Sequence, residues 1–230
     1  MAVSLASHLH ALGRHVVLVQ ADPQNNIEYH LGHTAASEHG LGNFLLHPKQ
    51  QDSLLQTQAE SALRHLPFGQ LNVPQILTVD RVLLEHPDRL TSLFKHPEFE
   101  DDCIVVVDLP RWPSTWCHQV LALSDLNLVT MVPDSNSVLS IDKLMPSLLQ
   151  SRGASYFLMN RFDSSKVLHL DLWTLCKMKL SHRLLPFYLH EDQALPESVA
   201  AGLPLQEYAP HSQLVEDVQK LCNWIDQEIG

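Results

Sequence analysis

Short apolar runs alternate along this chain with longer stretches in which apolar residues recur at helical spacing. Residues 16–19 (Val-Val-Leu-Val) and 104–107 (Ile-Val-Val-Val) are apolar at every position. A continuous run of this kind is typical of a strand in a parallel sheet that helices cover on both faces. The run at 104–107 therefore predicts a central strand. We expect further strands at 63–69, 126–132, 156–159 and 183–187.

Helical spacing fills most of the intervals between these runs. Leu5, Leu9 and Leu12 recur in step in residues 1–12, and Gly13 supplies a C-terminal stop. Either Asp134 or Ser137 could cap a helix over 138–150. The pattern predicts other helices at 83–95, with a break at Pro87, around Trp116, and at 167–180, 195–201 and 213–228.

The alternation of strands and helices predicts an α/β fold with a doubly wound, mostly parallel sheet and helices on both faces. No composition break marks a linker, so we expect a single domain over residues 1–230. One feature is unusual. The chain begins on a helix and runs into a parallel strand, whereas a βαβ crossover needs a strand before its helix.

Asp108 ends the apolar run 104–107 and is followed by Leu109-Pro110. In open α/β proteins, ligands bind at the carboxyl ends of the parallel strands. A carboxylate after four apolar strand residues is the Walker-B arrangement, in which the Asp orients the hydrated Mg²⁺ of a nucleotide. An acidic residue that opens a surface turn fits this stretch equally well.

Composition and charge narrow the function classes. The chain has 15 Lys and Arg against 26 Asp and Glu, a net charge of −11 that opposes non-specific binding to DNA or anionic lipid. No apolar run is long enough to cross a bilayer and no signal peptide is evident, which predicts a cytoplasmic protein. Four separated cysteines and 15 scattered histidines show no metal-binding spacing, so we expect no metal site built from the histidines.

Four blocks of the sequence together resemble the MinD/ParA superfamily of deviant-Walker ATPases, a branch of the P-loop NTPases. Residues 16–26 are similar to the switch-I region Asp-x-Asp-Pro-Gln, with Gln20 at the first Asp and Asp22 at the second. Residues 104–110 resemble the Walker-B and switch-II region, and residues 157–161 the strand whose terminal Asn-Arg reads adenine. Residues 184–208 resemble the closing strand, loop and helix. The blocks follow the family order.

Finer details resemble the BcsQ (YhjQ) family of cellulose biosynthesis proteins: Leu-Pro-Phe-Gly-Gln-Leu at 66–71, Val-Asp-Leu-Pro-Arg at 107–111, and Arg-Leu-Leu-Pro with His-Glu-Asp-Gln-Ala at 183–194. This resemblance implies a regulator of bacterial cellulose synthesis and secretion that binds ATP with Mg²⁺ and forms a homodimer around it. It also implies contacts with subunits of the cellulose synthase and secretion complex, no nucleic-acid partner, and attachment to the inner face of the cytoplasmic membrane only through partners.

Carried over by position, the resemblance assigns Asp22 to the attacking water as the catalytic residue. It implies that Asp108 holds the Mg²⁺ through a water molecule and that Asn160 and Arg161 contact the nucleotide base. Each residue alone also fits a structural role: Asp22 could cap the turn before Pro23, and Asn160 could occupy a turn. Their common order favours the nucleotide interpretation for Asp108 first and for Asp22 second.

The Gly-rich phosphate loop of the family is absent, because none of the eight glycines lies in a GxxxxGK[ST] pattern. That loop cradles phosphates with its backbone N–H groups. Residues 1–12 align with the helix that follows it, so we expect the first strand and the loop to be missing. Either the start codon is misplaced or the protein is short and silent toward nucleotide. Loss of a core strand is costly, which favours the first explanation. As printed, the chain is expected to bind ATP weakly at most and to hydrolyse none.

Three rival functions remain open. A ParA-type DNA-segregation ATPase would need a basic surface, which the charge balance opposes. MinD-type membrane targeting would need a basic amphipathic helix, but the helix at 213–228 carries mainly acidic residues opposite its apolar stripe. The helix is therefore expected to pack on the core or a partner. A catalytically silent scaffold that keeps the ATPase fold for binding other subunits is the third.

Overall fold

The computed structural model describes residues 1–24, 26–48, 55–57, 63–99 and 102–229. The chain divides into two compact units, residues 1–119 with 195–210 and residues 120–194 with 211–230. Each unit contains its own sheet. Asn25, which belongs to the block at residues 16–26, lies outside the described residues.

The first unit holds a four-stranded sheet in the order β2-β3-β1-β4. β1 (Val16–Gln20) runs parallel to both neighbours, β3 (Arg64–Leu66) and β4 (Ile104–Asp108). β2 (Gln56–Thr57) pairs antiparallel with β3. All five positions of β1, the four apolar ones and Gln20, are buried, as expected for a strand with partners on both sides.

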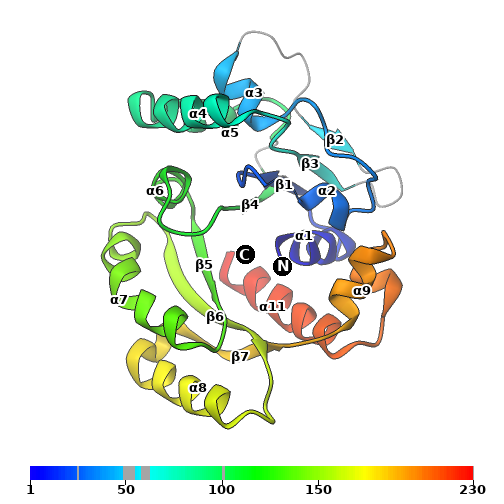
Figure 1. The fold of residues 1–230 in the computed structure, drawn as a ribbon, viewed down its shortest axis with the longest axis vertical. Coiled ribbons are helices and arrows are strands. Elements are labelled where there is room, and N and C mark those ends of the chain that lie inside the picture. Colours follow the sequence, from blue (N-terminus) through cyan, green and yellow to red (C-terminus); the bar gives the residue numbers. More distant parts are fainter. Residues whose placement is uncertain (25, 49–54, 58–62, 100–101, 230) are drawn as a thin grey trace. The chain divides into compact units, whose positions relative to one another are not determined.

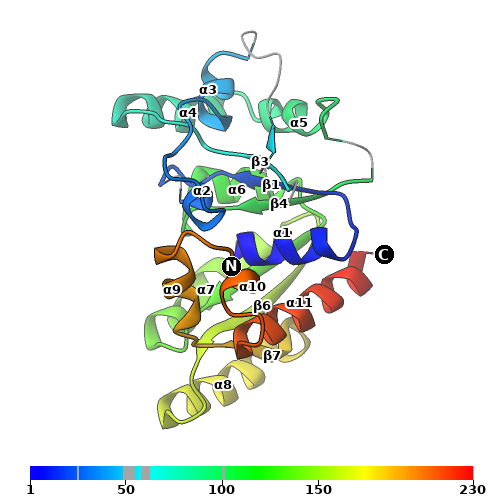
Figure 2. The same cartoon turned by 90° about the vertical axis from the view of Figure 1, so that its right-hand side faces the viewer.

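Helices cover both faces of this sheet (Figures 1 and 2). α1 (Ala2–Ala11) packs on one face, and α4 (Val73–Glu85) and α5 (Asp88–Phe94) lie on the other. α1 ends as its sequence indicates, with Gly13 at a φ of 84° that a residue with a side chain rarely adopts. Within the described residues, three further helices lie wholly in this unit: α2 (Ile27–His30), α3 (Leu41–Leu46) and α10 (Leu205–Tyr208). Two others lie mostly in it: α6 (Thr115–Leu121) and α9 (Ala194–Ala200).

The second unit holds a parallel sheet in the order β5-β6-β7. Its strands are β5 (Leu126–Met131), β6 (Ala154–Phe162) and β7 (Leu184–His190). α7 (Ser135–Leu149) and α8 (Val167–Leu180) cover one face and α11 (Gln213–Ile229) the other, while the short 3-10 helix η1 (Ser181–Arg183) leads into β7. Phe157 and Met159 of β6 are buried in one cluster with Ile141 of α7 and Trp173 of α8.

The predicted fold class is confirmed: an α/β architecture of mostly parallel strands with helices on both faces of each sheet. The single-domain assignment over 1–230 stays a prediction. The prediction that residues 104–107 form a central strand is wrong for the described residues, because β4 is the last strand of its sheet. All five β4 residues are half-buried. A strand with a neighbour on one side only keeps part of its surface exposed, however apolar its sequence.

Several boundaries differ from the sequence prediction. α4 begins ten residues earlier than expected, at a capping box in which the side chains of Asn72 and Gln75 bind each other's backbone N–H at 3.0 and 2.9 Å. β6 continues past Met159 to Phe162, so Asn160 and Arg161 lie inside the strand. β2 and α10 were not expected.

The C-terminal helix packs on the core, as predicted. Leu214, Val218, Leu221 and Ile225 of α11 are buried, whereas Ile229 at the end of the stripe is exposed. Asp217, expected on the polar side of this helix, is buried instead. Among the described residues, every helix is too short or too polar to traverse a lipid bilayer.

Candidate functional site

The carboxyl ends of β1 and β4 meet at one edge of the first sheet. Gln20, the last residue of β1, pairs with Asp108, the last residue of β4, and the backbone N–H of Ala21 donates to the Asp108 carbonyl at 2.9 Å. This parallel register places Asp22, two residues beyond β1, beside the end of β4. The structure therefore brings together the two carboxylates that the sequence singled out.

Asp22 sits in the turn that leaves β1. Its Oδ1 accepts a hydrogen bond from the backbone N–H of Gln24 at 3.0 Å, the geometry of a local Asx turn before Pro23. The local role that the sequence allowed for Asp22 is thus present. It occupies one carboxylate oxygen and orients the side chain at the sheet edge.

Asp108 is in an unfavourable electrostatic environment for a carboxylate. Burial raises its pKa above the ordinary value of 3.8, and the charge of Asp22 raises it further, while the amino group of Met1 acts in the opposite direction. Two nearby carboxylates repel each other, so a bound cation would stabilise both charges. This edge of the sheet favours cation binding for that reason.

Asn160 and Arg161 lie together in the second unit. The pairing of β6 with β7 is irregular between Met159 and Phe162, and Arg161 adopts a φ of 57° there. Asn160 Oδ1 accepts the backbone N–H of Arg161 at 3.0 Å. The guanidinium of Arg161 forms an ion pair with Glu191, with Nη2 at 2.7 Å from Oε1. The hydrogen bond of Asn160 to the left-handed Arg161 and the ion pair of Arg161 with Glu191 give both side chains a structural role that needs no bound nucleotide.

Mg²⁺ with a nucleotide would find only part of its usual site in these residues. Two carboxylates at one sheet edge are donors that Mg²⁺ accepts, so Asp22 and Asp108 fit the metal. No GxxxxGK[ST] loop is present in the sequence to surround the phosphates. The residues therefore fit the metal end of a Mg-nucleotide and leave its phosphates without their usual cradle.

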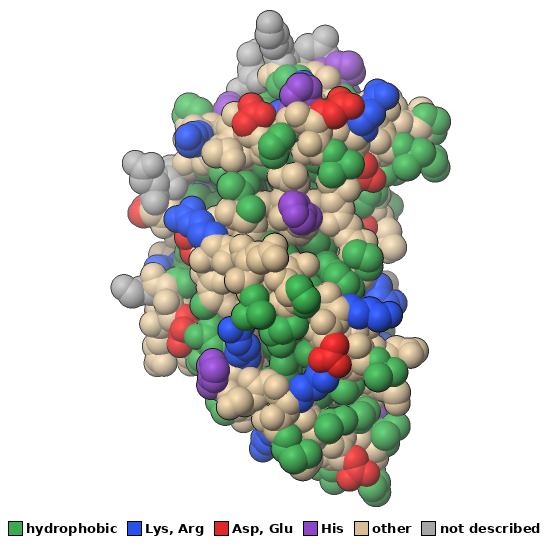
Figure 3. Space-filling view, turned by 90° about the vertical axis from the view of Figure 1, so that its left-hand side faces the viewer, with side chains coloured by type: hydrophobic (Ala, Val, Ile, Leu, Met, Phe, Trp, Pro, Cys, Tyr) green, Lys and Arg blue, Asp and Glu red, His purple; other side chains and the backbone are tan. Residues whose placement is uncertain are grey.

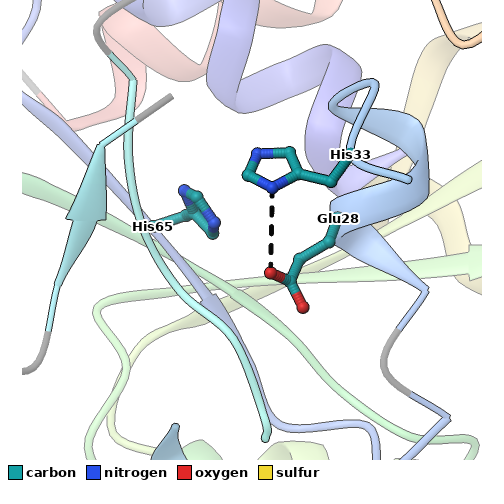
Figure 4. Close-up of side chains that lie close together, drawn as sticks. All are labelled: Glu28, His33 and His65. Atoms are coloured by element: carbon teal, nitrogen blue, oxygen red, sulfur yellow. Dashed lines mark ion pairs between the residues drawn. The ribbon is translucent and has the colours of Figure 1, made fainter. Parts of the chain in front are cut away.

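A second group of polar side chains escaped the sequence analysis. Glu28 of α2, His33 of the following turn and His65 of β3 converge in the first unit (Figure 4). The sequence carries no signal for this group, since 37 positions separate its first and last members and their meeting depends on the β1–β3 pairing.

Comparison with known proteins supplies a family and a fold. A family model described as "Cellulose biosynthesis protein BcsQ" matches residues 1–225. The cellulose biosynthesis protein BcsQ of Escherichia coli K12 is 26% identical over 226 residues, which cover 97% of this chain and 87% of the relative.

Two solved structures share the fold. The septum site-determining protein MinD of Pyrococcus horikoshii, complexed with Mg-ADP, superposes with a TM-score of 0.77 at 18% identity and covers 100% of this chain and 90% of its own. A ParA family ATPase of Chlorobium tepidum gives a TM-score of 0.73 at 19% identity, covering 96% of this chain and 91% of its own. The MinD/ParA-like fold that the sequence resembled is confirmed.

Proposed function

Since this chain belongs to the BcsQ family of cellulose biosynthesis proteins, we propose that it regulates bacterial cellulose synthesis and secretion as a switch subunit built on an ATPase fold. The single observation that carries the proposal is the meeting of Asp22 and Asp108 at the carboxyl edge of a parallel sheet, in a chain that matches the family model from residue 1 to 225. That edge is where open α/β folds bind their ligands.

In this proposal Asp108 holds a hydrated Mg²⁺ and Asp22 orients the water beside it. A Mg-nucleotide, when bound, would supply a charge that neutralises the two carboxylates, so that the nucleotide-bound and nucleotide-free forms would be the two states of the switch. The raised pKa of Asp108 supports the assignment, because a carboxylate that is costly to ionise gains most from a cation. Asn160 and Arg161 are proposed to contact the base, although Arg161 would then exchange its ion pair with Glu191 for the ligand.

The proposal excludes hydrolysis by residues 1–230 alone, because no phosphate loop is among them. A catalytically silent scaffold that binds other subunits of the cellulose system is the alternative that this absence favours. The proposed partners are subunits of the cellulose synthase and secretion complex and a second copy of the chain. Location at the cytoplasmic face of the membrane would follow from those partners.

One face of the molecule and the burial of α11 count against two rival functions. On the face drawn in Figure 3, basic side chains stand singly among acidic and neutral ones, whereas a duplex DNA surface needs clustered Lys and Arg. The apolar stripe of α11 is largely buried, which leaves it unavailable for a membrane.

Deletion of the coding region in the bacterium that encodes this protein tests the proposed function. We expect less cellulose, measured by binding of a cellulose-specific dye to the cells, with plasmid and chromosome segregation unchanged. Unchanged cellulose together with defective segregation would contradict the proposal and support the DNA-partitioning rival.

A further inference from the structure

Three side chains from separate segments of the first unit point toward one another. Glu28 comes from α2, His33 from the turn after α2 and His65 from the middle of β3 (Figure 4). One ligand atom from each lies within 4.8 Å of the other two, and Glu28 Oε1 is 4.0 Å from His33 Nδ1. The ring centroids of His33 and His65 are 5.3 Å apart, with the rings nearly perpendicular.

The carboxylate of Glu28 is fully buried and held in place. The backbone N–H and the hydroxyl of Ser37 donate to its two oxygens at 2.8 and 2.5 Å. These bonds fix the direction of the carboxylate, as residues behind a metal ligand do in known metal sites. Burying a carboxylate is costly, and a positive charge beside it offsets part of that cost.

His65 is the most informative member of the group. Its side chain is fully buried, and neither ring nitrogen has a hydrogen-bond partner within the described part of the chain. Buried polar atoms without partners are rare in native proteins, because each loses its hydrogen bonds to water. Burial lowers the pKa of His65, and the charge of His33 lowers it further. The charge of Glu28 and the Leu63 carbonyl act in the opposite direction, although that carbonyl does not meet the distance and angle of a hydrogen bond to the ring. A lowered pKa favours the neutral imidazole, the form that binds metals.

We propose that Glu28, His33 and His65 form a zinc-binding site. Two imidazoles and one carboxylate are a ligand set that Zn²⁺ uses in proteins, and they leave a fourth tetrahedral position for water. Imidazole ligands disfavour Mg²⁺ and Ca²⁺, which prefer oxygen throughout. The side chain of His33 is 30% exposed, which gives an ion access to the group from solvent.

Binding requires a small contraction of the group. Zinc bonds of about 2.0–2.2 Å in tetrahedral geometry place ligand atoms roughly 3.3–3.5 Å apart, against separations of up to 4.8 Å here. Glu28 belongs to a helix and His65 to a strand, whereas His33 lies outside both kinds of element, so we expect the side chain of His33 to make most of the movement. A bound ion would thus tie the turn after α2 to β3.

Titration of Zn²⁺ into the metal-free full-length protein, in competition with a chromogenic chelator, tests this site. We expect one tight site per chain. His33→Gln and Glu28→Gln should each weaken binding by at least about tenfold, since even the loss of a group behind a ligand costs 10- to 100-fold. His39→Gln is the matched control, because His39 is an exposed histidine in the same segment. Equal affinity in the His33→Gln and His39→Gln proteins would overturn the proposal.

A second measurement needs no variant and so does not depend on a mutant that folds. Co²⁺ bound in place of Zn²⁺ should give the intense visible absorption of a tetrahedral ion with nitrogen ligands, and Zn²⁺ should bleach it. Zn²⁺ should also raise the melting temperature, because a ligand that binds only the folded state stabilises it. Co²⁺ absorption as weak as that of the aqueous ion would rule the site out.

Discussion

Burial and the neighbouring carboxylate of Asp22 both make the charge of Asp108 unfavourable in the folded protein. Its pKa is raised above 3.8, so the folded state binds this proton more tightly than the unfolded chain does. Residues whose charged form destabilises the fold are often found at functional sites. A bound cation would stabilise the charged form of Asp108.

Asp108→Asn is therefore expected to raise the melting temperature near neutral pH. The native carboxyl stabilises the fold only while it is protonated. That contribution is complete below about pH 4 and is lost as the pH rises through the raised folded-state pKa. The difference in melting temperature between the variant and the wild type should widen from pH 4 to pH 7. Asp171→Asn makes the same chemical change at an exposed position of α8 and should leave the melting temperature nearly unchanged. A pH-independent difference for Asp108→Asn would contradict the argument.

The proximity of Asp22 and Asp108 follows from the sequence, because both residues end apolar runs and parallel strands align their carboxyl ends. Asp217 and the group of Glu28, His33 and His65 do not follow from it. Asp217 stands on the polar side of its helix by spacing, yet its Oδ2 accepts the backbone N–H of His190 at 2.9 Å and lies 2.6 Å from the imidazole Nδ1. These groups are assembled by tertiary contacts between distant segments, which spacing alone does not reveal.

At the scale of single elements, the start of α7 shows how one side chain fixes a helix boundary. Asp134 has extended backbone geometry, and its Oδ1 accepts the backbone N–H of Ser137 at 2.7 Å. Of the two caps that the sequence allowed, Asp134 is the one observed. The carboxylate also lies at the positive end of the helix dipole.

Asp134→Ala should lower the free energy of unfolding by about 1 kcal/mol, the usual cost of losing an N-cap side chain. Chemical denaturation followed by circular dichroism measures the change. Asn136→Ala, an exposed position in the first turn of the same helix, serves as the control and should leave stability nearly unchanged. Equal destabilisation by both substitutions would show that the cap contributes nothing specific.

Element types were predictable where apolar spacing was strong, as in β1, β5, α7 and α11. The start of α4 had a local signal, the Asn-x-x-Gln capping box at 72–75, that hydrophobic spacing overlooks. The course of β6 through Asn160 and Arg161 had none. β6 extends to Phe162 through an irregular pairing with β7 and a left-handed backbone conformation at Arg161. Both features depend on β7, so the local sequence does not indicate them.

For the whole chain, the absence of a phosphate loop in residues 1–230 has a direct consequence. Titration calorimetry with ATP and Mg²⁺ is expected to show no low-micromolar binding, and a phosphate-release assay no turnover above the buffer rate. Backbone N–H groups and a lysine normally supply most of the affinity for the phosphates, and Asp22 with Asp108 cannot replace them. Low-micromolar affinity would contradict this expectation.

The α/β fold class was predictable because the alternation of strands and helices admits few topologies, whereas the division of the strands between two sheets was not predicted. The edge position of β4 was not predictable. Four apolar residues in a row indicate that helices cover both faces of a strand, but they do not indicate whether another strand pairs with it on each side.

Cellulose output of cells that carry substitutions at the chromosomal locus tests most directly whether this protein acts through Asp108. Asp108→Asn should reduce dye-bound cellulose to the level of the deletion strain, while Asp171→Asn should match the wild type at equal protein level. Wild-type cellulose in the Asp108→Asn strain would show that Asp108 is a turn residue of a scaffold and would contradict the proposed nucleotide switch.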